Sequence, residues 1–213
     1  MAGQIVFDPN KGLTLPTFTT AQKNNILTPN IGALVYDTTL GAVCEYTSGG
    51  WVTLTGQGST ITSASTQTAS GPTIDFTNIP SWAKRITVML NNVSTDSATG
   101  LYIQIGSGSF STTGYTSQAW ASTGSGIVTN SFIIVSSTVG SAYNLSGNIV
   151  LAMMGGNIWT STGIIGFDNV TSTGFSSSGR SPTLSSALDR IRVLVGGSPP
   201  YNFDNGTINI FYE

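Results

Sequence analysis

The stretch GALVYDTTLGAVCEYTSGGWVTL, residues 32–54, reads as three short strands joined by two tight turns. Gly41 and the pair Gly49 and Gly50 stand at the turns, where tight hairpins need residues that adopt positive φ. Just upstream, Thr19 and Gln22 have the spacing of a helix capping box. The sequence therefore predicts a small N-terminal β-meander with one short helix.

So small a sheet cannot bury enough apolar surface to be stable alone. Yet it carries apolar side chains whose full burial is worth roughly 1.5–3 kcal/mol each. We therefore expect them to contact another copy of the segment or a larger assembly, as oligomer or anchor contacts. The residues are Val35, Tyr36, Tyr46, Trp51 and Leu54.

The rest of the chain changes character. Residues 58–72 are rich in Ser, Thr and Gly and lack a hydrophobic period, which predicts a linker or stalk. Residues 73–213 contain about eight stretches of alternating apolar and polar residues with Gly, Ser and Asn between them. The predicted organisation is mainly β: an N-terminal attachment or oligomerisation segment over 1–57, the linker, and a jelly-roll-like β-sandwich head over 73–213.

Charged residues make up 8% of the chain, against roughly 25% in an ordinary soluble domain. Such a surface has few of the like charges that keep neighbouring copies apart, so it suits permanent assembly. The formal net charge of -2 gives no basic field for nucleic acid. No apolar run approaches the ~20 residues of a membrane span, and the N-terminus lacks the pattern of a signal peptide.

Groups that carry catalysis are scarce. The chain has no histidine, which excludes a histidine general base, and its single cysteine, Cys44, is read as a small buried hydrophobe. We therefore expect no enzyme activity, no cofactor and no metal. Two alternatives stay open. Paired carboxylates could cleave polysaccharide, with candidates Asp75, Asp96, Asp168, Asp189 and Asp204. The segments 167–169 and 203–206 also offer oxygen ligands for calcium.

Aromatic residues in polar, loop-like segments are candidates for binding sugar rings, because their flat faces stack on the C–H face of a saccharide. The alternative is that each ring covers the core or a subunit contact. The candidate ligand-binding residues are Tyr115, Trp120, Trp159 and Phe175.

The motifs KGLTLPTFTTAQ, GALVYDTTLGAVCEY and GGW, within residues 11–54, resemble the N-terminal module of tail-fibre and related virion proteins of tailed bacteriophages. The segments IDFTNIPSWAKRITVML and FDNGTINIFYE resemble C-terminal domains of phage tail proteins. This resemblance implies a homotrimer that attaches by its N-terminal end to other virion proteins of the tail, baseplate or capsid, and presents its β-domain to the host.

The resulting hypothesis is a short trimeric tail fibre, assembled in the host cytoplasm, whose head binds a host surface glycan. Three copies would raise the affinity of each weak site through effective concentration. The alternatives are a capsid decoration or head-fibre protein and, from another class, a polysaccharide-cleaving adhesin.

Overall fold

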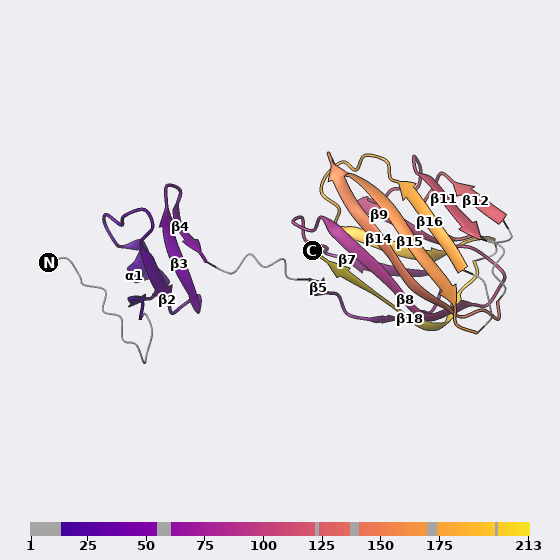
Figure 1. The fold of residues 1–213 in the computed structure, drawn as a ribbon, viewed down its shortest axis with the longest axis horizontal. Coiled ribbons are helices and arrows are strands. Elements are labelled where there is room, and N and C mark those ends of the chain that lie inside the picture. Colours follow the sequence, from indigo (N-terminus) through magenta and orange to yellow (C-terminus); the bar gives the residue numbers. More distant parts are fainter. Residues whose placement is uncertain (1–13, 55–60, 122–123, 137–140, 170–173, 199) are drawn as a thin grey trace. The chain divides into compact units, whose positions relative to one another are not determined.

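The structure is a computed structural model that describes residues 14–54, 61–121, 124–136, 141–169, 174–198 and 200–213 (Figure 1). The chain divides into two compact units, residues 1–60 and 61–213, here called the N-terminal unit and the sandwich unit. Strands dominate both units and the described part has one short helix, which confirms the predicted mainly β class. None of the described residues form a helix long and apolar enough to cross a membrane.

The N-terminal unit holds one sheet and the helix α1 (Thr20–Asn24). Thr19 caps the helix: its hydroxyl accepts a bond from the N–H of Gln22, and the Gln22 side chain accepts one from the N–H of Thr19. The predicted capping box is thereby confirmed. The sheet has the order β1-β2-β3-β4, with β1 parallel to β2 and the other pairs antiparallel. Its strands are β1 (Thr17–Phe18), β2 (Leu34–Asp37), β3 (Ala42–Thr47) and β4 (Gly50–Thr53).

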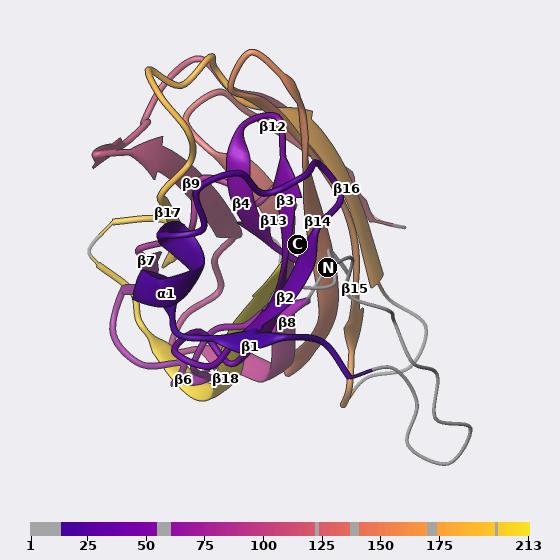
Figure 2. The same cartoon turned by 90° about the vertical axis from the view of Figure 1, so that its left-hand side faces the viewer.

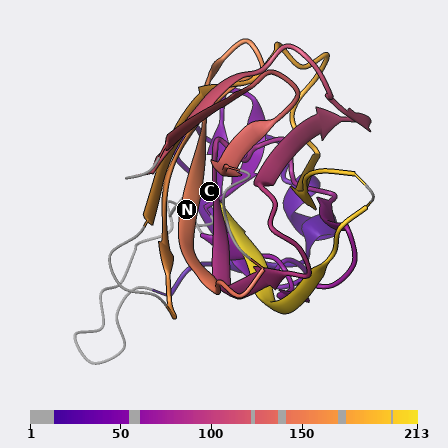
Figure 3. The ribbon, with the colours of Figure 1, turned by 90° about the vertical axis from the view of Figure 1, so that its right-hand side faces the viewer.

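The sandwich unit consists of two sheets packed face to face, which Figures 2 and 3 show as separate layers. The large sheet has the order β12-β11-β16-β15-β14-β8-β18-β5, and β6 also pairs with β18. Its strands are β5 (Thr62–Ser63), β6 (Gln67–Thr68), β8 (Arg85–Thr95), β11 (Thr116–Ala121), β12 (Gly124–Val128), β14 (Leu145–Gly155), β15 (Ile158–Phe167), β16 (Gly174–Arg180) and β18 (Phe203–Tyr212).

The small sheet has the order β10-β9-β17-β7, and β13 also pairs with β9. Its strands are β7 (Thr73–Thr77), β9 (Leu101–Ser107), β10 (Ser109–Phe110), β13 (Phe132–Val135) and β17 (Arg190–Val195). A β-sandwich is thus present as predicted, and the finer assignment to a jelly roll stays a prediction.

The core of the sandwich unit lies between the two sheets. Alternate residues of a strand point to opposite faces, so one half of each apolar pattern reaches the core. Ile86, Val88 and Leu90 of β8 do so from the large sheet, and Ile191 and Val193 of β17 do so from the small sheet. This inward set agrees with the alternation of apolar and polar residues in the sequence, because the period of a strand fixes which residues share a face.

The predicted linker over 58–72 needs a correction. Residues 55–60 lie outside the described residues, but from Ile61 onward the chain runs along the last strand of the large sheet. β5 pairs with Phe211 and Tyr212, and β6 pairs with Thr207 and Ile208. Backbone hydrogen bonds, more than the burial of apolar side chains, hold these short polar strands at the edge of the sheet. Their sequence therefore shows no hydrophobic period.

Candidate functional site

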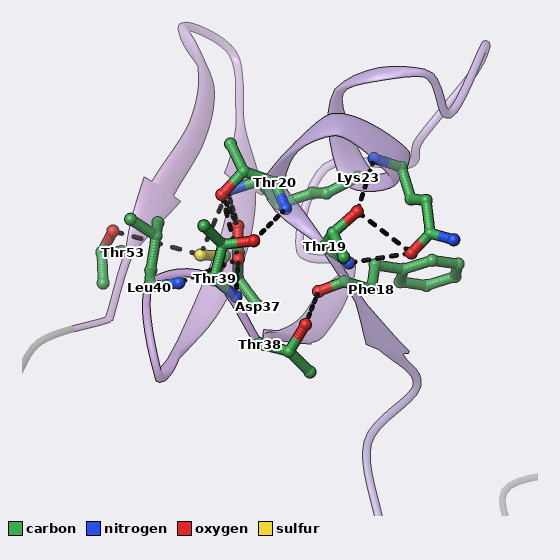
Figure 4. A network of polar contacts seen from close by, with 11 residues as sticks. Phe18, Thr19, Thr20, Lys23, Asp37, Thr38, Thr39, Leu40 and Thr53 are labelled. Atoms are coloured by element: carbon green, nitrogen blue, oxygen red, sulfur yellow. Dashed lines mark hydrogen bonds and ion pairs between the residues drawn. The ribbon is translucent and has the colours of Figure 1, made fainter.

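The N-terminal unit encloses an ion pair between α1 and β2 (Figure 4). Nζ of Lys23 lies 2.8 Å from Oδ2 of Asp37, and both side chains are buried. The hydroxyl of Thr20 donates to the same carboxylate, and the backbone N–H groups of Thr39 and Leu40 donate to its Oδ1. A buried charge is tolerated when partners and hydrogen bonds replace its water, which this arrangement provides.

The two charges hold each other in the ionised form. Burial by itself raises the pKa of Asp37, but hydrogen bonds from Lys23, Thr20, Leu40 and Thr39 outweigh it and bring this pKa down to about 2. The bond to Asp37 likewise raises the pKa of Lys23, against the opposing effect of burial. Lys23 also donates to Sγ of Cys44 at 3.4 Å. The thiol is fully buried, so the structure agrees with the reading of Cys44 as a core residue.

The small sheet of this unit has two different faces. Helix α1 covers the face that carries Val35, Asp37 and Cys44, because Lys23 of the helix reaches Asp37 and Cys44. The opposite face carries Leu34 and Tyr36, both exposed. Leu34 pairs with Glu45 of β3, and Glu45 pairs in turn with Val52 of β4. Val52 is exposed as well. Among described residues this open face is thus mostly apolar, with one carboxylate in its middle.

The five predicted anchor residues do not all lie on that open face. Val35 is buried within the unit, so it is not available to a partner, which corrects its assignment. Tyr46 and Trp51 are half-buried and pack edge to face, with their ring centroids 5.2 Å apart. Tyr36 and Leu54 are exposed and free to contact another chain. Val35 and Tyr36 are adjacent on β2, so they point to opposite faces of the sheet. This alternation could already be read from the sequence.

Sequence reasoning missed further exposed apolar residues of this unit. More than half of the large hydrophobic side chains that are exposed in the described structure belong to the N-terminal unit, with Tyr36 and Leu54 among them. Exposed apolar side chains gathered in a small unit mark an interaction surface. The residues not predicted are Leu27, Ile31, Leu34, Leu40 and Val52.

The predicted ligand-binding aromatics are dispersed. Tyr115 is only 2% exposed, and its ring packs edge to face on Phe132. Its hydroxyl donates to the carbonyl oxygens of Ile105 and Ser111 and accepts a bond from the N–H of Ile105. Burial raises the pKa of Tyr115 to about 12, although the bond with Ile105 opposes the shift. Tyr115 is a core residue that anchors its segment, which corrects its assignment as a sugar-stacking group.

Trp159 and Phe175 are also corrected, because they point inward from β15 and β16 and are buried. The segments that looked like loops around them are strands, and even some of their inward positions, such as Ser161 and Ser177, are polar. Trp120 of β11 is the exception: it is 45% exposed. The four aromatic residues therefore form no common binding surface in the structure.

The carboxylates proposed for polysaccharide cleavage are mostly engaged in local bonds. Asp75 pairs with Arg192 at 2.7 Å, and Asp189 pairs with Arg190. Asp96 accepts bonds from Asn202. Within the described residues, no group of three or more His, Cys, Asp or Glu side chains could hold a metal ion.

Asp168 and Asp204 come to the same end of the large sheet. Ser146 donates to Asp168 and accepts a bond from the N–H of Asn92, while Ser94 of the same strand β8 donates to Asp204. The segments 167–169 and 203–206, suggested as sources of calcium ligands, therefore lie at the same end of the large sheet, with β14 and β8 between them. Each carboxylate has a serine hydroxyl as partner, which is an ordinary way to satisfy a turn aspartate.

One pocket lies on the outer face of the small sheet. It has a volume of about 320 Å³, near the lower limit for ligand sites in proteins. Gln104 on its floor donates to the carbonyl oxygen of Asn130 at 3.1 Å. The ring of Tyr102 lies so close to Gly196 that a Cβ there would meet it at 2.3 Å. The lining residues are Tyr102, Gln104, Val128, Asn130, Ser131, Leu194, Val195, Gly196 and Gly197, all uncharged.

Comparison with known proteins gives one match. Residues 4–72 match the family described as the phage tail-like trimerisation region, which spans the N-terminal unit and the start of the sandwich unit. No curated protein and no solved structure matches the chain. The matched residues include the exposed apolar face around Leu34 and Tyr36. The match supports a phage tail-type structural protein, a component of a virion, that assembles as a homotrimer.

Proposed function

We propose that this chain is a trimeric tail fibre without catalytic activity, whose N-terminal unit holds the trimer on the virion and whose sandwich unit binds the host surface. The observation that carries the proposal is the coincidence of the trimerisation match with the open apolar face of the N-terminal unit. Three copies can cover Leu34, Tyr36 and Val52 from water, which a single copy leaves exposed.

Assembly is tested on the full chain by light scattering at two protein concentrations. Val52→Asp places a second carboxylate beside Glu45 on the open face, and like charges in contact oppose association. We expect the wild type to have the mass of three chains and the variant that of one. Thr77→Asp, on an exposed position of the sandwich unit, is the matched control and keeps the trimer. A wild-type protein that stays monomeric at both concentrations contradicts the proposal.

The pocket at Tyr102 and Gln104 is the best candidate for the host ligand. Its uncharged lining, with an aromatic ring and amide and hydroxyl groups, matches a neutral saccharide better than an acidic one. In a trimer three such pockets act together, so weak single-site affinity suffices for attachment.

Binding is tested with the full-length trimer and neutral polysaccharides from the host envelope. Leu194→Trp fills the pocket and should abolish binding, whereas Thr77→Trp on the same outer face leaves it intact. Binding that survives Leu194→Trp refutes this site. New reducing ends during incubation, lost in Asp168→Asn or Asp204→Asn, would instead establish the polysaccharide-cleaving alternative.

The position on the particle separates the tail fibre from a capsid decoration protein. A tag on the sandwich unit, seen by electron microscopy of whole particles, should appear at the tail. Tags distributed over the capsid would assign the chain to the shell instead.

A further inference from the structure

The two outer faces of the sandwich unit differ in chemistry. The outer face of the small sheet carries charged pairs: Asp75 with Arg192, and Asp189 with Arg190. Phe110 lies against this cluster, with its ring 4.2 Å from the guanidinium carbon of Arg192. These groups are partly exposed and paired, as is usual for a surface that faces water.

The outer face of the large sheet, toward the viewer in Figure 1, is different. Its registered strand pairs place Trp120, Ser176, Ile164, Asn148 and Met89 side by side in one row across β11, β16, β15, β14 and β8. The neighbouring row runs from Gln118 through Ser178, Thr162, Val150 and Thr87 to Phe211 of β18. Trp120, Ile164 and Phe211 are all exposed.

Charge is nearly absent from this face. The segments that form it are residues 116–120, 174–180, 160–166, 148–152, 85–91 and 207–211, and they contain no carboxylate. Their two cations, Arg180 and Arg85, both lie in the row at one end of the face. Arg85 is paired there with Glu213, at 3.0 Å. A broad face of Ser, Thr, Asn and apolar side chains resembles the centre of a protein interface, where charged residues are depleted.

We infer that the outer face of the large sheet is a contact between the sandwich units of neighbouring copies in the trimer. The inference rests on the trimer of the proposed function and adds a second interface to it. The occupant is another copy because the matched trimerisation region joins three chains, and because three uncharged faces can gather around the three-fold axis without repulsion. Around such an axis each face contacts its two neighbours with different parts of its surface. Trp120 is then a subunit-contact residue and not a sugar-binding one.

The size of the face fits a contact that forms only because the N-terminal units already hold the chains together. Six strands about 4.8 Å apart and three rows of outward residues cover roughly 500 Å², less than the ~800 Å² per partner of a stable free complex. Alone, two sandwich units would separate. Joined through their N-terminal units, they meet at a high effective concentration, so a weak contact stays closed.

The test is oxidative footprinting of the assembled full-length protein with hydroxyl radicals, read by mass spectrometry. Trp82 and Trp120 form a matched pair, since they are 51% and 45% exposed within one chain. Trp82 packs on Tyr212, away from the outer face, with ring centroids 5.6 Å apart. We expect Trp120 to be oxidised several-fold more slowly than Trp82 in the trimer.

A variant tests whether the protection comes from this face. Ile164→Arg inserts a cation in the central row and should raise the oxidation rate of Trp120 to that of Trp82. Thr77→Arg, on the small sheet, should leave Trp120 protected. Circular dichroism checks that both variants keep the fold of the sandwich unit.

The outcomes separate this inference from the proposed function. A trimer by light scattering in which Trp120 and Trp82 are oxidised at equal rates overturns the sandwich contact and leaves the trimer standing. A monomer by light scattering overturns both. A trimer whose Trp120 stays protected in Ile164→Arg also overturns the inference, because the contact then lies elsewhere.

Discussion

Lys23 and Asp37, fourteen residues apart in sequence, form a buried ion pair with 2.8 Å between Nζ and Oδ2. The pair connects the only helix of the N-terminal unit's described residues to the centre of its sheet. So small a unit has little apolar core, and a fully bonded polar network can specify one arrangement of helix on sheet. Several properties of the protein should depend on this pair.

Replacing Lys23 with methionine should unfold the N-terminal unit and reduce trimer formation, because Asp37 would remain buried without its counter-charge. Lys84→Met is the matched control: Lys84 is exposed and bonds to the carbonyl oxygen of Ser81. Light scattering and thermal melting of the full chain measure the effect. Equal melting temperatures and masses for the two variants would show that the ion pair is dispensable.

Acid should weaken the N-terminal unit through Asp37. Its pKa falls from an ordinary value of 3.8 to about 2 on folding, so the unfolded chain takes up a proton first as pH decreases. The stabilisation is therefore complete above about pH 5, decreases below it and is lost as pH falls through about 2. The free energies of unfolding of wild type and Asp37→Asn should differ by a constant amount above about pH 5, and this difference should shrink steadily toward pH 2. A difference that is the same at pH 2 as at pH 6 argues against this role.

Cys44 should report on unfolding of the N-terminal unit. It is the single cysteine of the chain and is fully buried, so a thiol reagent reaches it only when this unit opens. In native protein we expect labelling far slower than in denatured protein, and faster labelling in Lys23→Met. The rate of colour development with an aromatic disulfide reagent measures both. Immediate labelling of the native protein would contradict the buried position.

Two tryptophans of the sandwich unit should respond oppositely to alanine substitution. Trp159 is 1% exposed, so Trp159→Ala should cost roughly 3–5 kcal/mol in the free energy of unfolding. Trp120→Ala should change the stability of the sandwich unit itself by about 0.5 kcal/mol or less, because the side chain is exposed within its own chain. Hydrogen exchange of β14 and β15 gives the stability of this unit. Similar losses in both variants would disagree with the structure.

Gly163 and Gly166, both on β15, should differ as sites for alanine. A Cβ at Gly163 would meet Ile149 Cδ1 at 2.1 Å and the carbonyl oxygen of Asn148 at 2.7 Å, whereas the nearest atom at Gly166 is 3.9 Å away. Gly163→Ala should destabilise the sandwich unit by about 1–3 kcal/mol through overpacking. Gly166→Ala should stay within about 1 kcal/mol of the wild type. Urea denaturation compares the two variants, and a tolerated Gly163→Ala would refute the close packing of β14 on β15.

The strands of the sandwich unit could be foreseen where one face is buried. Ile86, Val88 and Leu90 alternate with residues that face outward, and this period is visible without the structure. The edge strands β5 and β6 could not be foreseen, because backbone pairing with β18 forms them and their side chains carry no pattern. Trp159 and Phe175 looked like loop residues because their strands are rich in Gly, Ser and Thr, and even inward positions such as Ser161 and Ser177 are polar.

By itself the sequence determined the strand-rich class, the capping box of α1, the scarcity of charge and the resemblance to virion proteins, because these follow from local periodicity, spacing and composition. Only the tertiary structure decided which side chains meet. It paired Lys23 with Asp37, buried Val35 beside exposed Tyr36, sent Tyr115 into the core and left Trp120 outside. Contacts between residues distant in the chain depend on how strands are ordered and registered in the sheets, and that order is a property of the whole fold.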